Sequence, residues 1–264
     1  MTGGGSTASH ATLHYAALDR VAHATFLRSE LSEETLDDLN DVVARVQADH
    51  IVRALVIRGE GEVFCAGMGP ELLESAFVDL EYFEHVLTRI AATCFSLEAL
   101  DVPVIAAVNG RATAAGLELA LSCDLIVAAD EALLGDAHSA SGMIPGGGSS
   151  IRLPRAIGVQ HARELIYSSR LVSGTEAATI GLALRSVPAA ELDAAVEAVA
   201  AGFTGKSRQT LAACKRQING GLGLDTPSGV EHERNELIRY LRVSNADALE
   251  GFRAAAEGRP PSWA

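Results

Sequence analysis

The sequence has few of the residues and motifs that would support metal, disulfide or membrane chemistry. Its eight histidines form no His-Glu-x-x-His motif, and its four cysteines form no Cys-x-x-Cys pair. This spacing predicts neither a metal site nor a disulfide framework, and it favours buried thiols in a reducing compartment. We read no signal peptide and no apolar run long enough to span a bilayer, so we expect a cytoplasmic protein with no membrane partner.

Basic residues are also scarce. The chain has 21 lysines and arginines against 34 aspartates and glutamates, which gives a formal net charge of −13. Such a balance argues against nucleic acid or an anionic membrane as the main partner. The 48% hydrophobic content, spread over 264 residues, is enough for one large α/β domain or for a domain with a helical appendage.

Hydrophobic periodicity predicts strands mainly in the first half of the chain and helices mainly in the second. Residues 1–9 include three consecutive glycines and are expected to be a disordered tail. Alternation predicts a hairpin over 13–18 and 21–27, and short apolar runs predict strands over 53–58, 103–108 and 124–129. Helical patterns cover 32–49, 80–100, 153–169, 175–180, 189–203, 207–219, 228–243 and 246–257. We therefore divide the chain into a tail, a core at 10–203 and a helical C-terminal region at 204–264.

The stretch at 109–124, N-G-R-A-T-A-A-G-L-E-L-A-L-S-C-D, follows the strand predicted at 103–108 and turns helical from about Ala115. The first N–H groups of that helix have no intrahelical partners and lie at the positive end of its dipole, so they can seat a developing negative charge. Glu118 stands one turn into the helix, on the same side as Ala114 or Ala115. An anion seat beside a carboxylate is a catalytic arrangement, although a glutamate in a first turn can also serve only to offset the dipole.

Two further loops carry unusual residues. The turn F-C-A-G-M-G at 64–69 has small residues that let a backbone approach a ligand closely, unless it is simply a glycine-rich loop. The irregular stretch at 133–150 places His138 near Asp136, Ser139 and Ser141. No P-loop lysine follows its glycines, so the stretch is not a phosphate cradle, and its histidine is either functional or a solvent-exposed bystander.

These motifs resemble the crotonase (enoyl-CoA hydratase/isomerase) superfamily over about residues 13–263. The resemblance rests on F-C-A-G-M-G, on N-G-x-A-x-x-x-G-x-E-L-A-x-x-C-D, on I-P-G-G-G and on the closing E-G-F-R-A-A-A-E-G-R-P-P-S-W. It implies an α/β fold with a core of stacked ββα units and a helical C-terminal trimerisation region. It also implies a homotrimer or hexamer, an acyl-CoA substrate, and no cofactor beyond the coenzyme A of that substrate.

The resemblance also assigns roles to single residues. The main-chain N–H groups of an oxyanion hole fall on Met68 and Ala115, and Glu118 matches the first of the two catalytic glutamates of hydratases. Two such N–H donors would stabilise the enolate of a thioester, and one donor is typically worth about 3–4 kcal/mol. The residues that would contact the adenine end of coenzyme A are Ala66, Gly67, Gly69 and Leu72.

The sequence departs from the family pattern at three places. The family's glycine triplet reads Ala114-Ala115-Gly116, and Gly69 stands where many members carry an aspartate. His138 stands where hydratases keep their second catalytic glutamate. We therefore expect Glu118 and His138 to share the acid and base roles, because their ordinary pKa values are well separated. A shift of the loop by one residue would present Asp136 instead.

The sequence is compatible with three functions. The first is an enzyme of hydratase or isomerase type that acts on an acyl-CoA through an enolate. The second follows from H-S-A-S-G-M-I-P-G-G-G, which also resembles the β-diketone hydrolase (6-oxocamphor hydrolase) branch, where a C–C bond is split without coenzyme A. In that reading His232-Glu233 resembles a His-Glu pair of the branch, and Glu233 would assist His138. The branch also carries an aspartate nine residues after its loop histidine, and this position is Gly147 here. The third is a coenzyme A-binding paralogue whose catalytic pair has decayed.

Overall fold

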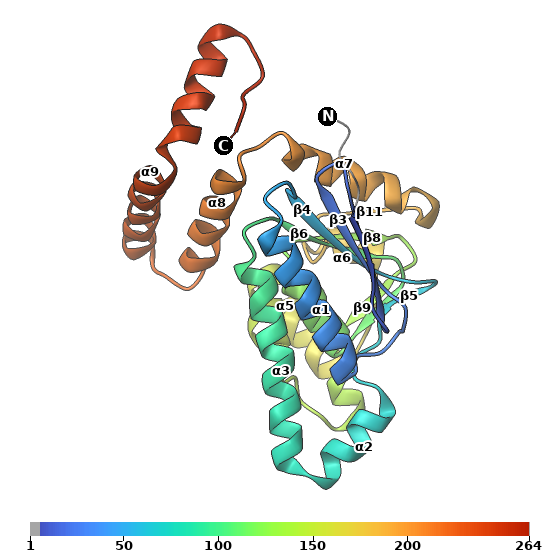
Figure 1. Cartoon of the computed structure of the whole chain (residues 1–264). Helices are drawn as coiled ribbons and strands as arrows, with labels where there is room; N and C mark the ends of the chain where they lie inside the picture. The colour runs from blue at the N-terminus through green and yellow to red at the C-terminus, as the bar shows by residue number, and fades with distance from the viewer. Residues whose placement is uncertain (1–5, 264) are drawn as a thin grey trace.

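Two β-sheets organise the part of the chain that the computed structural model describes, residues 6–263 (Figure 1). The large sheet has the strand order β1-β2-β3-β4-β6-β8-β11, and the small sheet has the order β10-β9-β7-β5. In the large sheet β1 (Ser6–Ser9), β2 (Leu13–Leu18) and β3 (Val21–Phe26) pair antiparallel, and β4 (Ala54–Gly59), β6 (Val104–Val108), β8 (Leu125–Ala129) and β11 (Arg185–Val187) continue from β3 in parallel. The fully buried residues of β6 place the core at the middle of this sheet.

The small sheet is the part that positions the site. Its strands β5 (Val63–Cys65), β7 (Arg111–Thr113) and β9 (Leu133–Gly135) are parallel, and β10 (Val172–Ser173) pairs antiparallel with β9. Neighbouring parallel strands have their C-terminal ends on the same side of a sheet. The turns that follow β5, β7 and β9 therefore all lie at the C-terminal end of the small sheet.

The chain passes three times through the same unit, in which a strand of the large sheet is followed by a strand of the small sheet and then by helix. The first unit is β4, β5, α2 (Pro70–Val78) and α3 (Leu80–Ala99), the second is β6, β7 and α4 (Ala115–Leu121), and the third is β8, β9 and α5 (Ser149–Ser168). The α/β fold with stacked ββα units that the sequence predicted is confirmed.

The helices begin where side chains can cap them. Ser32 forms a capping box with Thr35 at the start of α1 (Glu33–Ala48), and Asp79 accepts hydrogen bonds from two N–H groups at the start of α3. The apolar side chains that recur at helical spacing along α1 are buried: Leu36, Leu39, Val42, Val43 and Val46. The later helices are α6 (Gly174–Thr179), α7 (Leu192–Thr204), α8 (Arg208–Gly221) and α9 (Thr226–Glu257). Within residues 6–263, no helix is long and apolar enough to cross a membrane.

The structure differs from the sequence prediction mainly in short elements. The prediction of a disordered tail is wrong for Ser6–Ser9, which pair with residues 14–17 as an edge strand, and its other part, residues 1–5, lies outside the described residues. The strands of the small sheet are two or three residues long, too short for alternation to reveal them. The helices predicted at 228–243 and 246–257 are joined in α9, which has non-helical dihedral angles at Ser244.

The helical C-terminal region is attached to the core through a buried lysine. Figure 1 shows α8 and α9 as a hairpin beside the core, in orange and red. From α8, Lys215 Nζ donates to Leu97 O at 2.8 Å and to Asp124 Oδ2 at 2.7 Å, and only 7% of its side chain is exposed. Asp124 also accepts the N–H of Val104. The ammonium group of Lys215 thus joins α8 to the end of α3 and, through Asp124, to the starts of strands β6 and β8.

Replacement of Lys215 by methionine should lower the free energy of unfolding by about 1.5–3 kcal/mol, because it removes a charged hydrogen bond from the Asp124 carboxylate, whose side chain is 22% exposed. Urea denaturation at neutral pH measures this change. Lys206→Met is the control, since Lys206 is exposed. Equal stabilities of the two variants would contradict this account of how α8 is held.

Candidate active site

The turns that follow β5 and β7 lie against each other. Thr113 Oγ1 donates to Ala66 O at 3.2 Å and so links the two turns. Gly67 has a φ of +103°, and a Cβ built on it would lie 3.2 Å from Ala114 Cβ and 3.5 Å from Ala115 N. A side chain at position 67 would therefore be strained and would crowd the second turn. Glycine at this position lets the main chain at 67–68 approach the start of α4.

The two N–H groups assigned to the oxyanion hole are free of partners within the described part of the chain. Leu31 N donates to Gly67 O and Gly69 N donates to Leu31 O, which leaves the intervening Met68 N–H unused. Ala115 is the first residue of α4, so its N–H has no intrahelical partner. Both groups thus come from turns in contact and remain available to an acceptor.

The run Ala114-Ala115-Gly116 tolerates methyl groups at two of its three positions. Ala114 adopts a φ of +52°, a conformation that costs an alanine of the order of 1–3 kcal/mol. A Cβ on Gly116, in contrast, would lie 2.0 Å from Cys65 O. Only the last position must therefore be glycine, because the first turn of α4 packs directly on the end of β5.

Glu118 is buried beside these turns and is held by main-chain donors. Glu118 is 2% exposed, and its Oε1 accepts the N–H of Gly147 at 2.8 Å and the N–H of Ser149 at 3.0 Å. Burial raises the pKa of Glu118, and the N–H of Ser149, the charge of His138 and the N–H of Gly147 reduce that rise. The result is a carboxyl group whose pKa lies above the usual glutamate range, in a fixed orientation.

The turn after β9 brings Asp136 and His138 together. Ala137 has a φ of +60°, and this left-handed residue turns the chain so that His138 Nδ1 lies 3.1 Å from Asp136 Oδ1. Asp136 is fully buried, whereas the His138 side chain is 12% exposed. A carboxylate only accepts, so Nδ1 carries the proton and Nε2 is the ring atom left for other partners.

The pair also changes the pKa values of both groups. Burial lowers the pKa of His138, but the hydrogen bond and charge of Asp136 outweigh it, so that the net shift is upward. Burial raises the pKa of Asp136, but the hydrogen bond and charge of His138 outweigh it, so that the net shift is downward. The imidazolium form of His138 is thus stabilised. The sequence left open whether Asp136 or His138 would face the site; in the structure Asp136 is the more buried of the two and accepts a hydrogen bond from His138.

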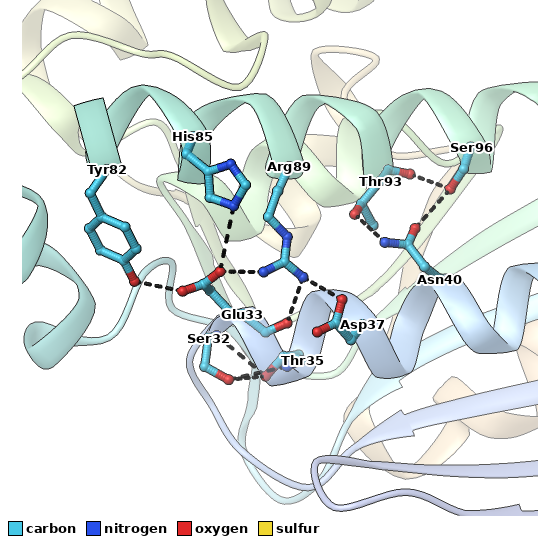
Figure 2. A network of polar contacts seen from close by, with 10 residues as sticks. All are labelled: Ser32, Glu33, Thr35, Asp37, Asn40, Tyr82, His85, Arg89, Thr93 and Ser96. Atoms are coloured by element: carbon cyan, nitrogen blue, oxygen red, sulfur yellow. Dashed lines mark hydrogen bonds and ion pairs between the residues drawn. The ribbon is translucent and has the colours of Figure 1, made fainter. Parts of the chain in front are cut away.

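Helix α3 closes the site from the side of Glu118. A Cβ built on Gly146 would lie 3.0 Å from Leu87, and one on Gly147 would lie 3.2 Å from Ile90. Figure 2 shows the polar network that fixes α3 on α1: Arg89 binds Glu33 and Asp37, and Tyr82 Oη donates to Glu33 Oε1 at 2.6 Å. Leu87 and Ile90 belong to the same helix as Tyr82 and Arg89, so this network anchors the helix that packs on the loop at Gly146 and Gly147.

The remaining predicted residues are distributed between the site and more distant positions. Gly69 precedes the first residue of α2, and Leu72 packs against the apolar cluster formed by Leu36, Val86, Ile90 and Cys94. Glu233 lies in the α8–α9 hairpin, where its carbonyl accepts from Gln217 Nε2, and no described hydrogen bond or ion pair joins it to His138. The N–H donors at Gly147 and Ser149 were not predicted from the sequence. The signal that could have indicated them is the run of three glycines in I-P-G-G-G.

The stacked ββα core and the abutting turns with free N–H groups are those of the crotonase class of proteins. The sequence matches the enoyl-CoA hydratase/isomerase family over residues 19–264, and the chain belongs to this family and is an enzyme of this type. It is 36% identical over 241 residues to the mitochondrial methylglutaconyl-CoA hydratase of Rattus norvegicus, which covers 89% of this chain and 75% of the relative.

Two bacterial relatives agree with this assignment. A putative enoyl-CoA hydratase/isomerase of Bacillus subtilis (strain 168) is 35% identical over 230 residues, with 87% of each chain covered. The crystal structure of an enoyl-CoA hydratase from Bacillus anthracis superposes with a TM-score of 0.86 at 32% identity and covers 98% of each chain. The family and the fold that the sequence predicted are therefore confirmed.

Replacement of Gly147 by alanine should reduce turnover by about 10²-fold, because its Cβ would lie 2.4 Å from Glu118 Oε2 and would displace the carboxylate. Steady-state kinetics on a panel of enoyl-CoA thioesters measures the loss. Gly202→Ala is the control, since a Cβ at that position meets nothing within 4 Å. If the two variants have the same activity, the position of Glu118 does not depend on this contact.

Proposed function

We propose that this enzyme acts on a 2-enoyl-CoA thioester through an enolate held by the N–H groups of Met68 and Ala115. The observation that carries the proposal is that neither N–H group has a partner among residues 6–263. Both lie on turns that touch, beside a buried carboxylate and a carboxylate-bound imidazole. Preorganised main-chain donors stabilise charge that develops on the thioester oxygen, each by about 3–4 kcal/mol. This is the interaction that makes a proton transfer at the α-carbon or an addition at the β-carbon feasible.

Glu118 and His138 are the proposed base and acid. The Glu118 carboxylate takes a proton from water, and the hydroxide oxygen bonds to the β-carbon. The electron pair of the C=C bond moves toward the thioester carbonyl, and the enolate then takes a proton from the His138 imidazolium at the α-carbon. The upward pKa shift of His138 favours the protonated form that this step requires. For isomerisation, the same two groups would remove and return protons on the substrate.

The coenzyme A part of the substrate is assigned to the turn after β5. Backbone groups of Ala66, Gly67 and Gly69, with Leu72 on the first turn of α2, would contact its adenine end. Ala66 and Gly69 are both partly exposed, as such a contact needs. The proposal needs no metal and no cofactor besides coenzyme A. Methylglutaconyl-CoA, named for the rat relative, is the first substrate to assay.

A homotrimer or hexamer is part of the proposal. Helix α9 exposes many large apolar side chains, which is typical of a surface covered by another subunit. These residues are Val230, Leu237, Ile238, Leu241, Val243, Leu249 and Phe252. The predicted cytoplasmic location stays a prediction, because the rat relative is mitochondrial.

The β-diketone hydrolase alternative has less support from the geometry. The aspartate that this branch needs falls on Gly147, where any Cβ would collide with Glu118. The polar network around His138 and Glu118 also argues against a decayed paralogue, since buried ionisable groups are costly to keep without a role. Turnover of a cyclic β-diketone without coenzyme A would favour the first of these alternatives, and binding without turnover would favour the second.

Replacement of Glu118 by glutamine should lower kcat for an enoyl-CoA by about 10²–10⁴-fold, because the amide cannot accept a proton. An acyl-CoA should still raise the melting temperature of this variant by several degrees, since about 2.7 kcal/mol is gained at a ligand concentration of 100 times Kd. Undiminished turnover would remove Glu118 from the mechanism. Absence of any stabilisation of the wild type by acyl-CoA thioesters would contradict the substrate class.

The pH dependence of kcat should be bell-shaped. Activity is lost as the pH falls through the pKa of Glu118, which lies above its ordinary value, and as the pH rises through the pKa of His138, which is also raised. Asp136→Asn removes the carboxylate charge that stabilises the imidazolium, so the pKa of His138 falls and the alkaline limb should move to lower pH. An alkaline limb that does not move would show that another group supplies the proton.

A further inference from the structure

One arginine lies next to the loop that holds Glu118 and takes no part in the proposed proton transfers. Arg152, in the first turn of α5, donates from Nη1 to Gly147 O at 2.7 Å. Its Nε donates to Glu98 Oε1 at 2.6 Å, and its guanidinium lies 5.7 Å from the centre of the Phe95 ring. With 13% of its side chain exposed, the guanidinium is fixed by a carboxylate, a ring and a main-chain carbonyl.

The carbonyl that Arg152 binds lies between the two donors of Glu118. Gly147 N and Ser149 N both donate to Glu118 Oε1, and Gly147 O belongs to the peptide between the two donating peptides. The torsions on either side of this middle peptide, ψ of Gly147 and φ of Gly148, set how the two donating peptides are oriented relative to each other. The bond from Arg152 therefore constrains the orientation of each donor.

The loop has few other means of keeping this conformation. Gly146, Gly147 and Gly148 have no side chains to pack, and glycine populates many backbone conformations. At Gly148, with a φ of +119°, a Cβ would lie 1.9 Å from Arg152 Nη1, so the guanidinium occupies the space that a side chain would need. Glu118 occupies the corresponding space at Gly147. The two glycines are thus held between the base on one side and the arginine on the other.

We propose that Arg152 is a positioning residue for Glu118, and that it acts by fixing the peptide between Gly147 and Gly148 so that both N–H donors point at the carboxylate. Glu98 and Phe95, both on α3, hold the guanidinium in place for this task. The inference rests on the proposed function, because it assumes that Glu118 is the base.

The pH profile gives a readout that a purely structural role would not change. Glu118 is faced by His138 and Asp136 from the turn after β9 and by Cys94 from α3, whereas Arg152 from α5 binds the carbonyl of Gly147. The N–H groups of Gly147 and Ser149 hold down the pKa of Glu118 against the effect of burial. When these donors are loosened, the pKa of Glu118 rises, and the acid limb of the pH profile moves to higher pH.

The test compares Arg152→Gln, Arg152→Lys and Glu98→Gln in the full-length protein with an enoyl-CoA that the wild type turns over. Arg152→Gln should lower kcat by about 10- to 100-fold, change KM by less than about 3-fold and move the acid limb to higher pH. Arg152→Lys keeps a donor for Gly147 O and should recover part of kcat. Glu98→Gln keeps an acceptor for Arg152 Nε and should lose less than Arg152→Gln.

Arg58→Gln is the matched control, because Arg58, on β4, also pairs with a carboxylate, that of Asp193 on α7. It should leave kcat and the acid limb unchanged. Circular dichroism and the melting temperature establish that each variant is folded. If Arg152→Gln does not fold, the acid limb of Arg152→Lys decides, because lysine cannot reproduce both bonds and the limb should still move part of the way.

The proposal is overturned if a folded Arg152 variant keeps kcat within about 2-fold of the wild type and the same acid limb. Glu118→Gln, measured in the same assay, separates this failure from a failure of the proposed function. If Glu118→Gln is inactive while the Arg152 variants are normal, only the role of Arg152 is wrong. If Glu118→Gln is fully active, the assignment of the base is wrong.

Discussion

The site depends on keeping one carboxylate inside the protein. An ionised carboxylate loses its hydration on burial, and it remains favourable only where N–H donors or charges replace the water. For Glu118 the replacement comes from Gly147 and Ser149, so the glycine-rich loop, the left-handed turn at Gly148 and the close packing of α3 all follow from one requirement. The loop must bring its main chain within hydrogen-bond distance of a side chain, and a Cβ at position 147 would collide with that side chain.

Much of the fold could be predicted because its larger elements carry strong periodic signals. The helix α1 shows a capping residue and a full apolar face, and β6 is a short apolar run closed by Asn-Gly. The small sheet escaped prediction because three residues of β5 or β7 give no usable period. Ser6–Ser9 form a strand by pairing with β2, and this pairing depends on the folded sheet and not on the local sequence.

The site could be predicted in its parts but not in its connections. The positions of Met68, Ala115, Glu118 and His138 followed from motifs, whereas the relation of Asp136 to His138 depends on a left-handed alanine between them. No sequence rule indicates that Ala137 adopts this conformation. In the same way, the hydrogen bonds from Gly147 and Ser149 require the third unit of the core to pack on the second, which is a property of the stack and not of either segment alone.

The three parallel strands of the small sheet each deliver one component of the site: Met68 follows β5, Ala115 follows β7 and His138 follows β9. The N–H groups of Met68 and Ala115 and the side chain of His138 thus follow three separate parallel strands of one sheet. Under the proposed function, an exchange of residues in the last turn would change the proton donor and leave the first two turns intact. Such a division lets one scaffold diversify its chemistry by changing a single loop, and it makes the turn after β9 the natural place to redesign the reaction.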